Sequence, residues 1–137
     1  MDSYSLQYYL SVYNRRIRHK INHALRPLGL NESNFFYLTV LDDNPGLSQS
    51  ELAEEIKREQ SIVTRNLNKL VAAGWIAKKQ SAKDRRKSRL FITVKTREKL
   101  PEVKAAVRQA VLKCEDNLSA AEADQLILLL RKAANLN

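Results

Sequence analysis

Hydrophobic residues recur at helical spacing along the first part of the chain. Between residues 6 and 28 they stand three or four positions apart, at Leu6, Leu10, Tyr13, Ile17, Ile21, Ala24 and Leu28. This spacing gathers them on one face of a long amphipathic helix. Pro27 and Gly29 favour an end to that helix, and Asn31 is suited to cap a second one.

Two capping boxes predict where later helices begin. Residues 48–51, Ser-Gln-Ser-Glu, predict a short helix to about Ile56, and residues 119–122, Ser-Ala-Ala-Glu, predict the last helix of the chain. A further helix is expected from Gln60 to Ala73, where Gly74 stops it. Another helix is predicted from apolar residues at helical spacing, namely Leu100, Val103, Val107, Ala110, Cys114 and Leu118.

Two short runs rich in β-branched and aromatic residues predict a hairpin. They cover residues 75–79 and 90–94 and flank a polar, very basic connection at 81–88. The predicted order is four helices, a hairpin and two helices. We therefore expect a mainly α protein with a small β-hairpin wing, a winged helix-turn-helix domain framed by long terminal helices.

Length and composition fit one folded domain. The chain has 137 residues, of which 44% are hydrophobic and 28% charged, and its longest apolar run, at 126–130, is far too short for a membrane span. The first residues lack the pattern of a signal peptide. Cys114 is the single cysteine, which excludes an intramolecular disulfide framework and a thiolate-rich zinc site. We expect a cytoplasmic protein with no membrane contact.

The positive charge is concentrated in the middle of the chain. Residues 57–99 contain fourteen basic and three acidic residues, a net charge of +11, whereas the remainder, with ten basic and twelve acidic residues, carries −2. Such a block is typical of a surface that binds a polyanion. Charge alone is equally compatible with an ordinary soluble surface.

The helix predicted over residues 60–73 has two distinct faces. Val63, Leu67 and Leu70 lie on one side, and the opposite side presents Ser61, Thr64, Arg65 and Asn68, with Lys69 next to them. These polar groups suit base edges and phosphates in the major groove. A solvated helix face is the alternative, but the capped helix before it and the basic hairpin after it favour DNA contact.

The predicted hairpin tip carries four cations and one carboxylate: Lys83, Asp84, Arg85, Arg86 and Lys87. The cations would repel one another without a nearby anion, such as a phosphate backbone or the minor groove. We expect Asp84 to organise the tip by holding one guanidinium, most simply that of Arg86.

In the order and spacing of its motifs, the sequence resembles the multiple-antibiotic-resistance regulator (MarR) family of bacterial transcription factors. The resemblance rests on Leu47–Ala53, Ser61–Leu67, Leu70–Ile76, the wing residues Asp84–Arg86, Ile92-Thr93 and Leu118–Glu122. It implies a homodimer with one recognition helix per subunit. It also implies a division of the single domain, residues 1–137, into dimerisation helices at 5–29 and 96–137 and a DNA-binding region at 31–94.

The sequence departs from the family pattern at three places. Lys57 and Arg58 stand where the family usually has glycine and an aliphatic residue, Thr96 replaces a common glycine, and Pro101 falls inside the expected fifth helix. Pro101 predicts a helix that kinks or starts late. The turn before the recognition helix is the other element whose geometry these departures affect.

Other residues admit two interpretations. Tyr9, Tyr13 and Phe36 belong to an aromatic set that we assign to core and dimer interface; the resemblance implies instead a pocket for a small aromatic ligand. His19 and His23 stand at helical spacing without a third metal ligand, so no metal is expected. We expect Cys114 to be a buried thiol, the alternative being a redox switch.

No pattern of an enzyme is present, neither a glycine-rich phosphate loop nor a G-x-S-x-G or H-E-x-x-H motif. We expect no catalytic site and no cofactor. The sequence predicts a homodimeric repressor that binds a palindromic operator in double-stranded DNA. The alternative is a winged-helix protein-interaction or architectural module that binds nucleic acid without sequence preference.

Overall fold

The computed structural model describes residues 2–84 and 86–136. A long helix α1 (Ser3–Leu25) is followed by a 3-10 turn η1 (Arg26–Leu28) and then by helices α2 (Glu32–Asp43), α3 (Gln49–Ile56) and α4 (Gln60–Ala72). Strands β1 (Ile76–Gln80) and β2 (Ser88–Ile92) precede the two last helices, α5 (Val94–Cys114) and α6 (Ala120–Ala133). The mainly α fold with one hairpin is thus confirmed.

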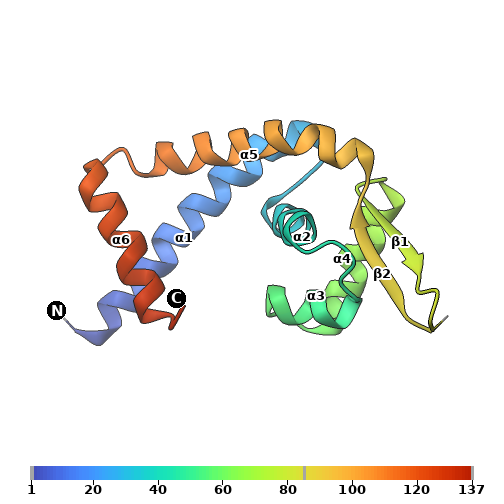
Figure 1. Cartoon of the computed structure of the whole chain (residues 1–137). Coiled ribbons are helices and arrows are strands. Elements are labelled where there is room, and N and C mark those ends of the chain that lie inside the picture. The colour runs from blue at the N-terminus through green and yellow to red at the C-terminus, as the bar shows by residue number, and fades with distance from the viewer. Residues whose placement is uncertain (1, 85, 137) are drawn as a thin grey trace.

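The elements form two regions connected by α2 and α5 (Figure 1). α1, α6 and most of α5 lie at one end together with both termini, while α3, α4 and the hairpin lie at the other. α1 and α5 pack along each other, and the Cys114 thiol donates to the Arg16 carbonyl oxygen at 3.8 Å. None of the described helices has the length and apolar character needed to cross a bilayer.

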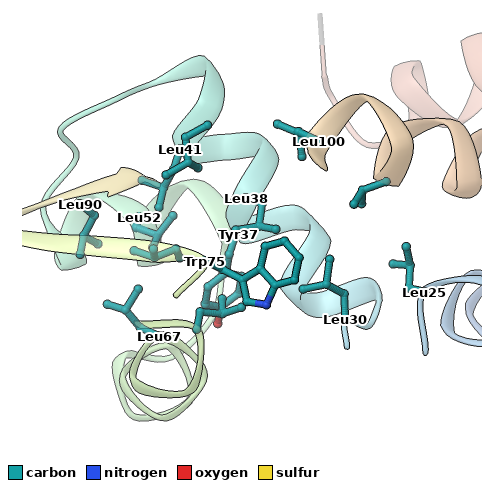
Figure 2. Close-up of a cluster of buried hydrophobic side chains, with 14 of the residues drawn as sticks. Leu25, Leu30, Tyr37, Leu38, Leu41, Leu52, Leu67, Trp75, Leu90 and Leu100 are labelled. Atoms are coloured by element: carbon teal, nitrogen blue, oxygen red, sulfur yellow. The ribbon is translucent and has the colours of Figure 1, made fainter. Parts of the chain in front are cut away.

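One continuous core joins the two regions. α2 lies in its centre, since Tyr37, Leu38 and Leu41 are fully buried. Figure 2 shows leucines of α3, α4 and β2 on one side of these side chains, and leucines of α1 and α5 on the other. Besides these three residues of α2, the figure labels Leu25, Leu30, Leu52, Leu67, Trp75, Leu90 and Leu100. Because the packing is shared, the position of α4 depends on α2 and α5.

The hairpin is antiparallel, and Ile76 pairs with Ile92 and Gln80 with Ser88. It is attached to the helical core by a β-bridge between Leu47 and Leu90. The second strand ends two residues earlier than predicted. Thr93 instead caps α5, because its side chain accepts the Thr96 N–H, and Val94 starts the helix. The prediction that Thr93 and Val94 belong to the second strand is therefore wrong.

The terminal helices differ from the prediction in detail. α5 begins at Val94 and runs through Pro101, so the expectation of a late start is wrong. Leu118 lies beyond its end. The predicted capping box of α6 is confirmed, with bonds in both directions between Ser119 and Glu122. At the start of α3 one of the two bonds is present, from the Glu51 N–H to the Ser48 hydroxyl.

Candidate nucleic-acid interface

α3 and α4 form a compact helix-turn-helix whose turn contains a left-handed residue. Lys57 has φ 60 and ψ 49, a conformation that normally favours glycine. The backbone N–H of Arg58 reaches the Ala53 carbonyl at 3.2 Å and completes the end of α3. The two departures from the family pattern thus leave the turn intact and place two exposed cations beside the start of α4.

The two faces predicted for α4 are confirmed by burial. Val63, Leu67 and Leu70 pack into the core. The opposite side is exposed, and it contains Ser61, Thr64, Arg65, Asn68 and Lys69. Asn66 lies between the faces, where its amide donates to the Tyr37 hydroxyl at 3.2 Å and ties α4 to α2.

Gln49, the first residue of α3, was not among the predicted site residues. Its Nε2 donates to the Thr64 hydroxyl, which in turn donates to the Gln60 carbonyl at 2.8 Å. Gln49 is half-buried and stands beside the exposed face of α4. Fifteen positions separate the two side chains, so no local motif indicated the contact.

Three side chains at the start of α5 bind three successive carbonyls after α4, an arrangement called here the carbonyl clamp. Lys95 Nζ donates to the Ala73 oxygen at 3.1 Å, and the Thr93 hydroxyl to the Gly74 oxygen at 2.7 Å. The buried Thr96 hydroxyl donates to the Trp75 oxygen at 2.6 Å. Lys95 Nζ also lies 4.5 Å from the centroid of the Trp75 ring, within the range of a cation–π contact. Hence Thr96, another departure from the family pattern, fixes α4 relative to α5.

The tip of the wing is organised by backbone bonds. The Arg86 N–H donates to Asp84 Oδ1 at 3.0 Å, and the Lys87 N–H donates to the Asp84 carbonyl at 3.0 Å. Among the described residues no ion pair joins Asp84 to Arg86, so the expectation that Asp84 holds the Arg86 guanidinium is wrong. An Asp side chain readily captures the backbone N–H two residues later, which costs no ordering of a long side chain. Lys83 and Lys87 are exposed, and Arg85 lies outside the described residues.

The basic block predicted from the sequence forms an exposed surface. All thirteen of its described lysines and arginines are exposed. Over residues 2–84 and 86–136 the ion pairs are Arg18–Glu32 and Lys104–Asp42, both outside this block. The cations of α4, the wing and the preceding turn are thus not neutralised by carboxylates in the described part of the chain, which favours an external polyanion.

The aromatic residues do not converge on one site. Tyr9 and Tyr13 line a groove of about 560 Å³ between α1 and Leu126 of α6, whereas Phe36 is exposed on α2 and does not line it. Burial, together with the nearby Glu115 carboxylate, raises the pKa of Tyr13. A tyrosine hydroxyl is protonated at neutral pH in any case, so this shift leaves it able to donate a hydrogen bond.

The remaining candidates lie away from this surface. Cys114 is buried, as predicted. His19 and His23 are exposed on α1, and no group of three or more metal-ligating side chains gathers anywhere in the described chain.

Comparison with known proteins agrees with this arrangement. The MarR family model matches residues 30–88, from just before α2 to the start of β2. A structure of the transcriptional repressor CouR bound to a 23-mer DNA duplex shares 28% sequence identity and superposes with a TM-score of 0.88, covering 94% of this chain and 92% of that one. The chain is therefore similar to the MarR family, by the family model over residues 30–88 and by structure over most of its length.

Other MarR structures extend the likeness to the framing helices. A mutant MarR from E. coli complexed with operator DNA is 22% identical, with a TM-score of 0.86 and coverage of 97% of this chain and 99% of that one. A MarR regulator from Methanosarcina mazei Go1 is 20% identical, with a TM-score of 0.87 and coverage of 98% and 90%. At these identities the likeness concerns the fold, and it includes α1, α5 and α6.

Proposed function

We propose that this chain is a sequence-specific transcriptional regulator that binds double-stranded DNA, acting as a homodimeric repressor that occludes a palindromic operator. The observation that carries the proposal is the exposed, unneutralised basic surface around α4 and the wing. Cations on such a surface bind phosphates and release counterions. The DNA-bound structures of CouR and of E. coli MarR support the same use of the fold.

We propose that α4 reads bases and that the wing anchors the backbone. The proposed site comprises Ser61, Thr64, Arg65, Asn68 and Lys69 on α4, and Lys83, Asp84, Arg85, Arg86 and Lys87 on the wing, where the four cations would make the contacts. Arg and Asn form bidentate pairs with guanine and adenine, whereas cations on a loop follow phosphates or the narrow minor groove. Asp84 contributes by shaping the turn rather than by direct contact.

The uncovered apolar residues of the terminal helices support a dimer. α6 has no buried residue, and Ile127, Leu128 and Leu129 are each more than half exposed, as is Leu6 on α1. Exposed large apolar side chains in this number on neighbouring helices favour an interface. We propose that residues 5–29 and 96–137 dimerise around a twofold axis and that residues 31–94 bind DNA, with the two copies of α4 about one helical turn of DNA apart.

The groove beside Tyr9 and Tyr13 supports release of the repressor by a small aromatic ligand. Its volume of about 560 Å³ lies in the range of ligand pockets. The Tyr13 hydroxyl would supply one polar contact in a groove that also has apolar walls at Leu6, Leu10 and Leu126. Phe36 is not part of this proposal, because it does not line the groove. We propose no catalytic step and no cofactor, in keeping with a family of transcription regulators.

Selection of bound sequences from a random DNA pool tests the proposal. A specific regulator should enrich one palindrome and bind it about 10³-fold more tightly than random DNA at fixed salt. Equal affinity for every sequence would instead favour an architectural or protein-interaction module. Arg65→Ala should relax the preference at one operator position, while Lys87→Ala should weaken all sequences alike and lower the salt slope by about one.

Sedimentation tests the dimer independently. Leu128→Glu places a charge on the apolar face of α6 and should yield monomers at micromolar concentration. Val94→Glu is the matched control, because Val94 is 67% exposed and Leu128 62%, but Val94 lies next to the hairpin. A wild-type monomer, or dissociation by the control alone, would contradict the proposed interface.

A further inference from the structure

The hydrogen bonds between α3 and α4 determine which part of Thr64 is available to DNA. A threonine hydroxyl has one hydrogen to donate and two lone pairs to accept with. The Thr64 hydrogen is used in the 2.8 Å bond to the Gln60 carbonyl. One lone pair accepts the Gln49 amide. The hydroxyl consequently has no donor left for the acceptors that guanine, adenine and thymine present in the major groove.

The same bonds fix the orientation of the Gln49 amide. Because the Thr64 hydroxyl already donates to Gln60, only the NH2 group of Gln49 can face it. Gln49 makes no other side-chain hydrogen bond in the described part of the chain, so its Oε1 and one N–H remain available. Gln49 begins α3 directly after the capping residue Ser48, and its backbone position is therefore well defined.

We propose that Gln49 is a specificity-determining residue of this interface: it holds the Thr64 hydroxyl against α4, so that Thr64 reads DNA with its methyl group and favours thymine through the C5-methyl. This inference rests on the proposed DNA-binding function. The contact is apolar, and its specificity arises because cytosine, guanine and adenine carry no methyl at that place in the groove. Gln49 acts through Thr64, as a positioning residue.

Replacing single thymines of the selected operator by deoxyuridine tests this directly, since only the C5-methyl is removed. For the wild type, one position per half-site should lose about 3- to 10-fold in affinity, the value of one buried methyl. Thr64→Val has a methyl on both branches of Cβ, so it presents a methyl in either orientation and should keep this sensitivity without the bond to Gln49. Thr64→Ser keeps the hydroxyl and should bind the thymine and deoxyuridine operators equally.

Gln49→Met, which removes the amide at similar length, should reduce the sensitivity at the same position while changing the affinity for random DNA less than twofold. Thermal melting of each variant establishes that it is folded. Tight, thymine-selective binding by Thr64→Ser together with loss of binding by Thr64→Val would overturn the inference and show that the hydroxyl reads the base. Unchanged sensitivity in Gln49→Met would overturn the role of Gln49. A wild type that selects no sequence at all would instead overturn the proposed function.

Discussion

The left-handed residue in the turn between α3 and α4 permits a test on protein stability. At this position a glycine variant should be more stable than an alanine variant, which reverses the order usual in a helix. Lys57 has φ 60, where a residue with a Cβ pays about 1–2 kcal/mol and glycine does not. In an ordinary helix interior alanine is more stable than glycine by about 1 kcal/mol. At Lys57 we expect the opposite, with Lys57→Gly more stable to unfolding than Lys57→Ala by about 1 kcal/mol, after the greater chain entropy of glycine is subtracted.

The comparison is internally controlled, because both variants remove the same exposed charge and the same contacts of the lysine stem. Urea unfolding followed by circular dichroism measures the difference, at one protein concentration because a dimer's stability depends on it. For a chain of this length about 1 kcal/mol corresponds to roughly 3 °C in Tm. Lys57→Ala as stable as Lys57→Gly would refute the reasoning from backbone geometry.

Three further outcomes follow from the contacts described above. Thr96→Val removes the hydroxyl that binds the Trp75 carbonyl and should lower the free energy of unfolding by about 1 kcal/mol in urea; no loss would contradict a role for the clamp. The Ser119 backbone N–H and hydroxyl lower the pKa of Glu122, so this stabilisation is present above the ordinary carboxyl pKa and is lost as the pH falls through the lowered value. Glu122→Gln should remove that part of the pH dependence of stability, measured by circular dichroism during acid unfolding. An unchanged pH profile would mean that other groups cause the acid dependence. Asp84→Asn keeps an acceptor for the wing turn and removes a negative charge, so binding to all DNA should tighten at fixed salt; weaker binding would mean that the carboxylate itself is needed.

The helices could be predicted because their signals are local. Apolar spacing placed α1 and the buried face of α4, and short caps at Asn31 and Ser119 placed the starts of α2 and α6. The predicted end of the second strand was wrong, and the reason is also local. Thr93 suits a strand by its branched side chain and a helix start by its hydroxyl, and the capping bond to Thr96 decides between them.

The contacts that position the site could not be predicted, since they join residues far apart in sequence. Gln49 and Thr64 are fifteen positions apart, and Thr96 and Trp75 twenty-one. The sequence predicted that the Asp84 carboxylate accepts a hydrogen bond within the wing, but the donor is the Arg86 backbone N–H and not a guanidinium. Two donors compete for that carboxylate, and the backbone N–H two residues later is held close by the chain itself, whereas a guanidinium must first be ordered.

Because of the carbonyl clamp, a movement at one end of α5 is transmitted to the residues after α4. The N-terminal end of α5 donates hydrogen bonds to the residues after α4, and Cys114 at its C-terminal end contacts Arg16 of α1. The twenty-one residues of α5 span about 31 Å, so a tilt of about 5° at the α1 end displaces the far end by about 3 Å. A binding constellation is productive only within about 0.5 Å. A small wedge between α1 and α5 would therefore shift α4, the helix that we propose reads bases, without touching its exposed face.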